Sequence, residues 1–315
     1  MTSPRATPYS MSDLPLAGGI AYHLGISAEQ LAPSIVIVGD PERVDLIADT
    51  FFESHECRVS HRGLTTCTGI VRETRQRVTV TTTGMGAPST EIVLNEISAL
   101  SEIDTATRIR RSSSPSALTI IRVGTSGALQ RSTPLGTAVI SSHAVGIDST
   151  AWFYGDGMTD DATARELAAG ARSVIEGALE PHHVAHGKIH PYGSVADIAV
   201  VDALRASADA LGIAYQVGAT VTASGFFAPQ GRDVSRVRPA VPDIDRLLAR
   251  DPRFLNMDME TAFVLHLCRA FGYRAGAICV AAAHRELDTF STAISSQVSD
   301  AVRVALAALA RLASS

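Results

Sequence analysis

Residues 118–127 read LTIIRVGTSG, an apolar run that ends in glycine, threonine and serine. The part from Leu118 to Val123 has the length and β-branched content of a buried strand. Arg122 interrupts the apolar pattern one residue before that strand ends, and a turn is expected at residues 124–127. A strand followed by a polar, glycine-containing turn is typical of α/β sheets that bind ligands at the carboxyl ends of their strands.

Similar runs lie on both sides and alternate with helical patterns. Strands are expected at residues 34–39, 78–83, 137–141, 217–223 and 275–281, and helices at 41–49, 88–100, 160–179, 198–211, 258–271 and 295–312. Near-continuous apolar strands between helices predict an α/β sheet covered on both faces. This pattern alone does not distinguish an open doubly wound sheet from one that closes on itself.

Length and composition favour one domain, because the chain has 315 residues, of which 46% are hydrophobic. Residues 1–18 are rich in proline and serine and are expected to form a flexible N-terminal segment before a domain at 19–315. Residues 110–116 (RRSSSPS) are expected to form a surface loop within that domain.

Charge and cysteine usage narrow the class of protein. A net charge of −5 argues against a nucleic-acid-binding surface. The chain has no apolar run near the length of a membrane span and no apolar core of a signal peptide. The cysteines lack metal-site spacing and are expected to be reduced thiols; they are Cys57, Cys67, Cys268 and Cys279. We therefore expect a cytoplasmic protein with no nucleic-acid or membrane partner and no bound metal.

Four glycine-containing turns are expected at the carboxyl ends of strands: GDPER (39–43), TGMG (83–86), GTSG (124–127) and FFAPQGR (226–232). Any one of them alone more often just ends a strand. Free backbone amides beside Arg43, Arg122 and Thr125, however, have the composition expected of a phosphate cradle. A GxxxxGK[ST] motif is absent, and the GxG at Gly84 lacks the third glycine of a dinucleotide fingerprint.

The order of seven motifs resembles the nucleoside phosphorylase superfamily, and most closely its uridine phosphorylases. The motifs are HLG (23–25), GDPERV (39–44), SHRG (60–63), TGMGAPS (83–89), IIRVGTSGAL (120–129), FFAPQGR (226–232) and MDMET (257–261). The resemblance covers nearly the whole chain after residue 20. It implies a single α/β domain whose central mixed β-sheet closes partly into a barrel flanked by helices. It also implies a pentosyltransferase that uses inorganic phosphate as co-substrate and needs no cofactor.

The resemblance also assigns phosphate and ribose positions. The phosphate-binding positions are matched by Gly39, Arg43, Arg122 and Thr125, and by Arg62, which matches an arginine lent by a neighbouring subunit. The ribose positions are matched by Met259 and Glu260, and by His23, which matches a histidine lent by that neighbour to the 5′-hydroxyl. A homodimer or a hexamer with active sites shared between subunits follows from the resemblance. Without it, His23 would be interpreted as a surface histidine and Glu260 as a helix-start acid.

The base positions of the resemblance point to a pyrimidine. They are matched by Ser126, Gly127, Phe226, Gln230, Arg232 and Arg285. A glutamine amide offers the donor and the acceptor that uracil N3–H and O2 require, and a guanidinium suits O4. Purine-cleaving relatives place an aspartic acid where this chain has residues 283–285 (AHR). The predicted reaction is phosphorolysis of uridine, or of related pyrimidine nucleosides, to uracil and ribose 1-phosphate, with Arg122, Gln230 and Arg232 as catalytic groups.

Three stretches depart from the family pattern. Asp258 stands where the family usually has the longer glutamate. The pair Arg62–Gly63 lacks the glutamate that helps some members hold a monovalent cation, so no such ion is expected. Residues 155–190 resemble an insertion with an extra helix. The insertion holds a histidine cluster that is expected to be a polar loop and not a zinc site: His182, His183, His186 and His190.

Other functions stay open. A purine phosphorylase would need a replacement proton donor, for which His284 is a candidate. A nucleosidase that uses water would dispense with the arginines, and a non-catalytic nucleoside-binding protein would bind uridine without turnover. The choice among uridine, deoxyuridine and thymidine, and between dimer and hexamer, is also open.

Overall fold

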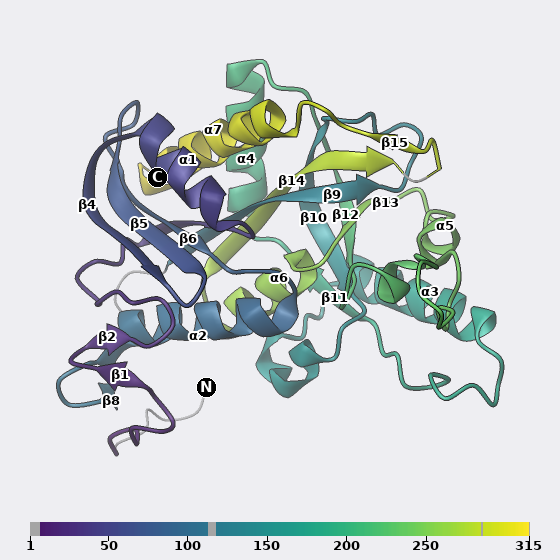
Figure 1. The fold of residues 1–315 in the computed structure, drawn as a ribbon, viewed down its shortest axis with the longest axis horizontal. Coiled ribbons are helices and arrows are strands. Elements are labelled where there is room, and N and C mark those ends of the chain that lie inside the picture. The colour runs from purple at the N-terminus through teal and green to yellow at the C-terminus, as the bar shows by residue number, and fades with distance from the viewer. Residues whose placement is uncertain (1–6, 113–117, 285, 315) are drawn as a thin grey trace.

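A mixed sheet of 11 strands runs through the part of the chain that the structure, a computed structural model, describes: residues 7–112, 118–284 and 286–314 (Figure 1). Part of this sheet is a closed barrel. Its strands, in spatial order, are β14 (Arg274–His284), β10 (Ala138–Gly146), β12 (Tyr215–Thr222), β13 (Phe254–Asp258) and β9 (Thr119–Ala128). Strand β9 pairs with β13 and also, in parallel, with β14, and this second pairing closes the barrel. The partly closed mixed sheet implied by the resemblance is therefore confirmed.

An open wing of the sheet continues from β9. It consists of β3 (Ser34–Val38), β6 (Arg77–Thr82), β5 (Leu64–Val71) and β4 (Phe52–His61). Strand β3 is parallel to both of its neighbours, β9 and β6. Strand β5 pairs antiparallel with β6 and forms a long antiparallel hairpin with β4. The sequence analysis missed this hairpin. Strand β4 (FESHECRVSH) lies at the edge of the sheet and is mostly exposed, so it carries charged residues in place of an apolar run.

Two predicted boundaries were wrong at the ligand-binding edge. Residues 124–127 are not a turn, because β9 continues through them to Ala128 and pairs with β14 over that length. The helix expected from residue 258 begins three residues later: Asp258 ends β13, and α6 spans Thr261–Phe271. Met259 and Glu260 therefore lie in the connection between a strand and a helix.

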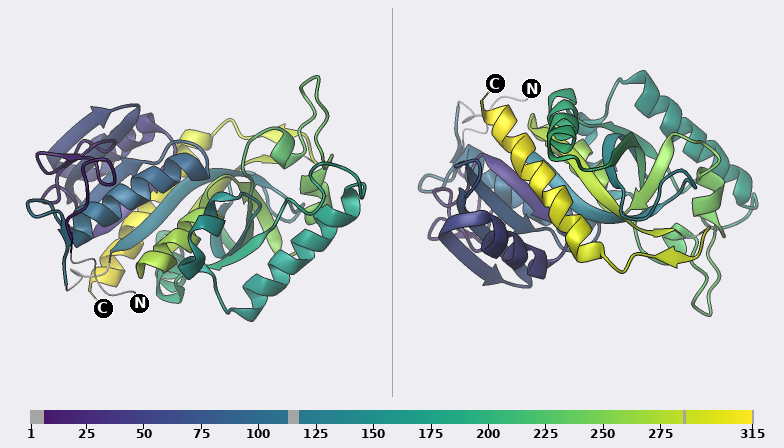
Figure 2. Two further views of the ribbon diagram at one scale, coloured as in Figure 1. Left: turned by 90° about the horizontal axis from the view of Figure 1, so that it is seen from below. Right: turned by 90° about the horizontal axis from the view of Figure 1, so that it is seen from above.

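Helices cover both faces of the sheet. Helix α7 (Ile294–Ala313) crosses β9, β14 and β3 where the wing meets the barrel, and α4 (Ile198–Leu211) packs beside it (Figure 2). On the other face, α2 (Ala87–Glu102) packs against α6. Helix α1 (Pro41–Phe51) covers β5 and β6. The helices predicted near 41–49, 88–100, 198–211 and 295–312 are all present.

Residues 155–190 contain α3 (Ala162–Ala178), which packs on β10, β11 (Tyr192–Val195) and α5 (Ile244–Leu248). Leu167, Ala171 and Ile175 of α3 are buried in a hydrophobic cluster with the outer end of the barrel. The extra helix is thus part of the core, while its status as an insertion stays a prediction. Residues 180–191 form turns and irregular structure, so the polar loop expected for the histidine cluster is present.

The remaining elements are short. Two hairpins are formed by β1 (Leu16–Ala17) with β2 (Ile20–Ala21) and by β7 (Ile103–Asp104) with β8 (Ile109–Arg110), and β15 (Thr289–Phe290) pairs with β14. Leu14 and Leu16 are buried, and the flexibility expected of residues 1–18 stays a prediction. The surface loop expected at 110–116 lies mostly outside the described residues. Within the described ranges, no helix has the length and apolarity needed to cross a bilayer.

Candidate active site

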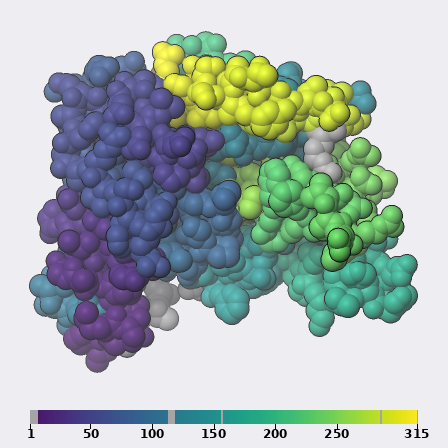
Figure 3. Space-filling model, in the orientation of Figure 1, coloured from purple at the N-terminus to yellow at the C-terminus, as the bar shows by residue number. Residues whose placement is uncertain are grey.

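A cavity of about 730 Å³ opens where the strands β3, β6, β9 and β13 end. Its size falls in the usual range of small-molecule sites. All four glycine-containing segments expected at strand ends contribute to its lining, including residues 124–127 within β9. The space-filling view shows the surface hollowed below α7, between the wing and the segment around residues 225–250 (Figure 3).

Most of the predicted site residues meet in this cavity. Those that line it are Gly39, Arg43, Arg122, Thr125, Ser126, Gly127, Phe226, Gln230, Arg232, Met259 and Glu260. His23 and Arg62 do not line it, and Arg285 lies outside the described residues. Within one chain these residues therefore lie around a single cavity, and the role of each stays a prediction.

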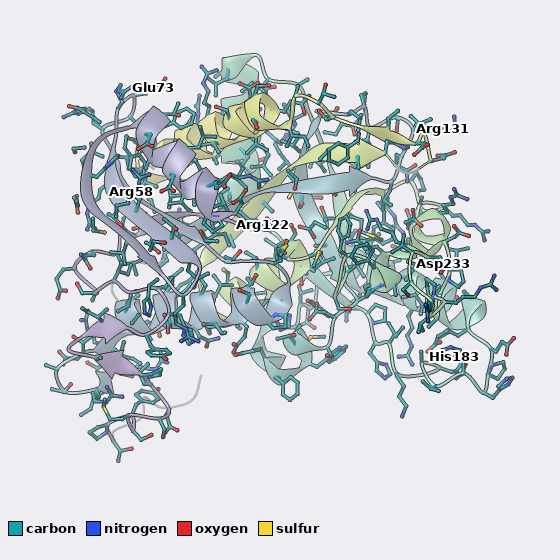
Figure 4. The ribbon with its side chains drawn as sticks, viewed as in Figure 1. Arg58, Glu73, Arg122, Arg131, His183 and Asp233 are labelled. Carbon is teal, nitrogen blue, oxygen red and sulfur yellow. The ribbon has the colours of Figure 1, made fainter. Side chains whose placement is uncertain are left out.

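Two guanidinium groups define one end of the cavity. Arg122 rises from β9 at the centre of the molecule, and its side chain is only 5% exposed (Figure 4). Arg43 stands on the first turn of α1, where burial lowers its pKa; Asp40 opposes this effect, and Arg122 adds to it. Because the two cations disfavour each other, an anion placed between them would be stabilised.

Arg122 is held by two carboxylates. Its Nη2 donates to Glu260 Oε2 and lies 3.2 Å from Asp258 Oδ2. Burial lowers the pKa of Arg122, but Glu260 and Asp258 outweigh burial, so the net direction is upward and the group stays charged. Arg122 Nε is buried without a hydrogen-bond partner among the described residues. An anion with several acceptor oxygens could satisfy this donor.

Glu260 also accepts a hydrogen bond from the backbone N–H of Gly86, at 2.6 Å. Gly86 begins α2 with φ 84°, a conformation that favours glycine. Burial raises the pKa of Glu260, while Arg122 and the Gly86 amide act to lower it. The carboxylate thus bridges the end of β13, β9 and the start of α2.

Asp258 supports this arrangement. Its Oδ1 accepts from Thr222 Oγ1 at 2.7 Å, and its Oδ2 accepts from the N–H of Thr261 at 3.1 Å and from Thr261 Oγ1 at 2.5 Å. The side chain therefore caps α6 and joins β12 to β13. Asp258 lies three residues before Thr261, which provides the first N–H group of the helix. A short acidic side chain suits this capping position, and this accounts for aspartate in place of glutamate.

Three of the predicted base-binding residues come from one segment that lines the cavity: Phe226, Gln230 and Arg232. The Arg232 guanidinium lies over the Phe226 ring, 3.8 Å from its centroid, and donates to Gln230 Oε1. Gln230 is 5% exposed and Phe226 51% exposed. The guanidinium, a planar cation suited to aromatic faces, occupies one face of the Phe226 ring. A flat ligand ring that stacks on this face would have to displace it.

A buried polar chain fixes Ser126 from behind. Asn256 Nδ2 donates to Ser126 Oγ at 2.9 Å, its Oδ1 accepts from Thr220 Oγ1 at 2.7 Å, and Thr220 Oγ1 lies 2.7 Å from Ser141 Oγ. Sequence reasoning missed Asn256, Thr220 and Ser141. In the sequence, the one feature that could have indicated them is a polar residue within the apolar pattern of a strand.

Phe290 and Ile294 also line the cavity and were missed. Phe290 is 68% exposed on β15, and Ile294 begins α7. No motif marks these two residues, and only the return of the chain from β14 brings them to the cavity. Met85, at the mouth, is 80% exposed and belongs to a turn that the sequence did single out.

His23 and Arg62 meet elsewhere, on the outer surface of the wing. Arg62 Nη1 donates to Tyr22 Oη at 3.2 Å, and the Tyr22 and His23 rings lie 4.9 Å apart, edge to face. His23 Nδ1 lies 2.7 Å from Glu96 Oε1 on α2. The two residues expected to serve a neighbouring subunit thus form one surface group with Tyr22.

His284, the candidate proton donor of the purine alternative, is buried away from the cavity lining. Its Nε2 lies 3.0 Å from the carbonyl oxygen of Gln130, and its Nδ1 accepts from the N–H of Leu287 at 3.4 Å. In this arrangement Nε2 faces the Gln130 carbonyl and Nδ1 faces the Leu287 amide. Both ring nitrogens are therefore used by the backbone.

The histidines of residues 182–190 lie on exposed turns. His182 Nε2 pairs with Glu180 at 3.0 Å, and His183 Nδ1 accepts from the N–H of Ala185. Among the described residues, no three metal-binding side chains gather into a cluster.

Residues 33–315 match the model of the phosphorylase superfamily, and the chain belongs to that superfamily. It is 29% identical over 281 residues to a uridine phosphorylase of Thermococcus kodakarensis, an alignment that covers 87% of this chain and 81% of the relative.

Solved structures show the same likeness. A nucleoside phosphorylase of Trypanosoma brucei, described as showing uridine phosphorylase activity, matches with a TM-score of 0.81 and 30% identity over 96% of this chain and 100% of that one. A purine nucleoside phosphorylase of Toxoplasma gondii, in complex with immucillin-H, shares the fold with a TM-score of 0.63 and 21% identity over 93% and 96% of the two chains. The predicted family and fold are confirmed: the chain is a pentosyltransferase that cleaves nucleosides by phosphorolysis, with nucleoside and phosphate as substrates.

Proposed function

We propose that this enzyme is a uridine phosphorylase, which converts uridine and inorganic phosphate to uracil and ribose 1-phosphate. The observation that carries the proposal is the pairing of Gln230 with Arg232 over Phe226, in the same cavity that Arg43 and Arg122 line. An amide and a guanidinium side by side complement the oxygens and N3–H of a uracil ring.

The proposed reaction breaks the bond between C1′ and N1 and forms a bond between C1′ and a phosphate oxygen. Phosphate lies between Arg43 and Arg122, below the ribose that Glu260 and Met259 hold. As the C1′–N1 bond lengthens, positive charge on the ribose faces the phosphate dianion, and negative charge on the uracil faces Arg232 and Gln230. Catalysis then depends on positioning and on electrostatic stabilisation of the transition state. Phosphate is the only co-reactant, and the proposed reaction requires no cofactor.

A purine substrate is disfavoured by the same geometry. A departing purine is stabilised by protonation at N7, and the candidate donor His284 is engaged by the backbone on both ring nitrogens. A hydrolytic nucleosidase is disfavoured because Arg43 and Arg122 line the side of the cavity that attacking phosphate would occupy.

The proposed enzyme is a homodimer, or a ring of dimers, with shared active sites. His23 and Arg62 lie outside the cavity of their own chain and share contacts with Tyr22. In a two-fold dimer this surface group would reach the cavity of the second chain. A cytoplasmic location is part of the proposal and is supported by four free cysteines, of which three are buried.

The test is a cleavage assay with uridine, deoxyuridine, thymidine, cytidine, inosine and adenosine, each with and without inorganic phosphate. We expect uracil and ribose 1-phosphate from uridine only when phosphate is present. Release of hypoxanthine from inosine at a higher kcat/KM would assign the enzyme to purines, and base release without phosphate would make it a nucleosidase.

The base assignment is tested by Arg232→Ala. Loss of one charged donor that faces the leaving group should raise the barrier by about 3 kcal/mol, roughly a hundredfold loss of kcat. Arg236→Ala is the matched control, because Arg236 is exposed on the same loop and does not line the cavity. Unchanged uridine turnover in Arg232→Ala would refute the base assignment.

A further inference from the structure

Arg108 holds the N-terminal segment that leads to His23. Its guanidinium donates to backbone carbonyl oxygens and to no carboxylate of the described residues. The carbonyls belong to Tyr9 (Nε, 2.9 Å), Ser10 (Nη2, 2.7 Å), Leu14 (Nη2) and Leu16 (Nη1, 3.5 Å). The carbonyl oxygen of Arg108 also accepts from the N–H of Tyr9 at 2.9 Å. One side chain therefore binds both ends of residues 9–16.

The turn that carries Arg108 is shaped for this contact. Arg108 has φ 59°, a left-handed conformation that side-chain-bearing residues rarely adopt. Asp104 Oδ1 stabilises the turn by accepting from the N–H groups of Ala106 and Thr107, at 3.1 and 2.7 Å, and from Thr107 Oγ1. These bonds hold the backbone in the conformation that directs the guanidinium to the segment.

A second hold lies further along the same segment. Glu96 accepts from the backbone N–H of His23 at 2.9 Å and of Leu24 at 2.8 Å, and binds His23 Nδ1 at 2.7 Å. Glu96 is on α2, and the hairpin β7–β8 that carries Arg108 begins directly after α2 ends at Glu102. The segment from Tyr9 to Leu24 is thus tied at both ends to one continuous structural unit.

The contacts of Arg108 and Glu96 fix the position of His23. With Nδ1 bound to Glu96, the ring has Nε2 left for another partner. Tyr22 beside it is 46% exposed and is contacted by Arg62. A loose N-terminal segment would instead let His23 sample many positions, and the entropy of ordering it would reduce any binding energy at a second chain.

We propose that Arg108 is a positioning residue for the ribose site: by binding four carbonyls of residues 9–16, it holds His23 in place to contact the 5′-hydroxyl of a nucleoside in a second copy of this chain. The inference rests on the proposed function and its shared site. Arg108 touches neither substrate nor cavity, so its effect passes through His23.

The test compares Arg108→Gly with Arg75→Gly. Glycine accepts the left-handed turn, so the substitution removes the guanidinium without straining the backbone. Arg75 is a matched control because it also has a positive φ, 58°, and its exposed side chain pairs with Glu53 on the wing. Amide hydrogen exchange at residues 9–24 is measured first. We expect exchange at least tenfold faster in Arg108→Gly than in the wild type or in Arg75→Gly.

The second measurement is kcat/KM for uridine and for 5′-deoxyuridine, which lacks the hydroxyl that His23 would contact. Arg108→Gly should lower kcat/KM for uridine about tenfold, mainly through KM, in line with the loss of one hydrogen bond. Turnover of 5′-deoxyuridine should stay unchanged, and adding His23→Ala should cause no further loss. Equal losses for the two nucleosides would indicate general damage and overturn the proposal, as would unchanged exchange.

The two hypotheses fail in different ways. If the wild-type enzyme does not cleave uridine, the proposed function is wrong. Faster exchange in Arg108→Gly alone would then still support the clamp on residues 9–24, whereas unchanged exchange would overturn it.

Discussion

Arg122 and Glu260 are separated by 138 positions in the chain, yet Nη2 of the arginine donates to Oε2 of the glutamate on the wall of the cavity. The two side chains are 5% and 8% exposed. The residue expected to bind phosphate is therefore paired with the residue expected to bind ribose. Because both ligands would act on this pair, binding of phosphate and binding of nucleoside are expected to be coupled.

Glu260→Gln should separate the two effects. The change removes the carboxylate that faces Arg122, so phosphate should bind more tightly. Loss of a charged acceptor for ribose hydroxyls, about 1.5–3 kcal/mol, should lower kcat/KM for uridine roughly 10- to 100-fold. Calorimetry with phosphate and steady-state kinetics with uridine measure the two effects. Glu286→Gln, which alters an exposed pair with Arg131, should change neither. Weaker phosphate binding in Glu260→Gln would contradict the coupling.

Gly124→Ala should displace the phosphate-binding guanidinium. A Cβ at residue 124 would lie 2.3 Å from Arg122 Nη1. Arg122 is buried and held by Glu260 and Asp258, so it can move only by giving up an ion pair. Misplacement of this kind should cost roughly a hundredfold in kcat/KM for phosphate. Gly170→Ala, on the exposed face of α3 with open space around it, is the control and should keep full activity. Wild-type kinetics in Gly124→Ala would show that the position of Arg122 is not critical.

Local patterns were sufficient to predict the elements that are buried and periodic. Strand β3 is an almost continuous apolar run, β6 is buried and alternates valine with threonine, and β9 begins with a mostly apolar stretch. Helix α4 lies at the predicted residues. The hairpin β4–β5 was missed because β4 is an exposed edge strand and the buried β5 (LTTCTGIV) is rich in threonine, so neither is an apolar run. Closure of the barrel depends on β9 pairing with β14, a contact between residues more than 150 positions apart, and no local pattern specifies it.

The candidate site divides in the same way. Strand ends carrying glycine and arginine were sufficient to predict that Arg43, Arg122 and the 226–232 loop converge. The pairing of Arg122 with Glu260, and the support of Ser126 by Asn256, arise only when β13 packs beside β9. Phe290 reaches the cavity because the chain turns back after β14 and forms β15 beside it. Residue types alone do not indicate this pairing.

Stability should fall in mild acid because of His266. This residue is fully buried on α6, its Nε2 lies 2.7 Å from the carbonyl oxygen of Tyr154, and its Nδ1 is without a hydrogen-bond partner among the described residues. Burial lowers its pKa below the ordinary 6.5, against a smaller upward effect of the Tyr154 carbonyl. The unfolded chain therefore takes up a proton first as the pH falls. The stabilisation is complete above pH 6.5 and is lost as the pH falls from there through the folded pKa.

His266→Gln removes this titration. The glutamine amide can still donate to the Tyr154 carbonyl, so the variant should fold, with a lower Tm at pH 7.5. Between about pH 6.5 and 5.5 its free energy of unfolding should fall less steeply than that of the wild type, by up to about 1.4 kcal/mol per pH unit. Thermal melts over this range measure the difference. His182→Gln, at an exposed histidine, should keep the wild-type slope. Parallel curves for wild type and His266→Gln would rule out His266 as the cause.

Shared active sites should allow two inactive variants to restore each other. His23→Ala/Arg62→Ala disables the group that a chain would lend, and Arg232→Ala disables the cavity that it would keep. In a mixed two-fold dimer, one of the two sites combines an intact cavity with an intact lending group. The isolated mixed dimer should therefore have about half of wild-type activity, and an unseparated random mixture about a quarter. Co-expression with two different affinity tags isolates the mixed dimers, and uridine phosphorolysis measures them. Mixed dimers that form but stay as inactive as their parents would contradict the shared site. His23 and Arg62 of one chain would then contribute nothing to the cavity of the other chain.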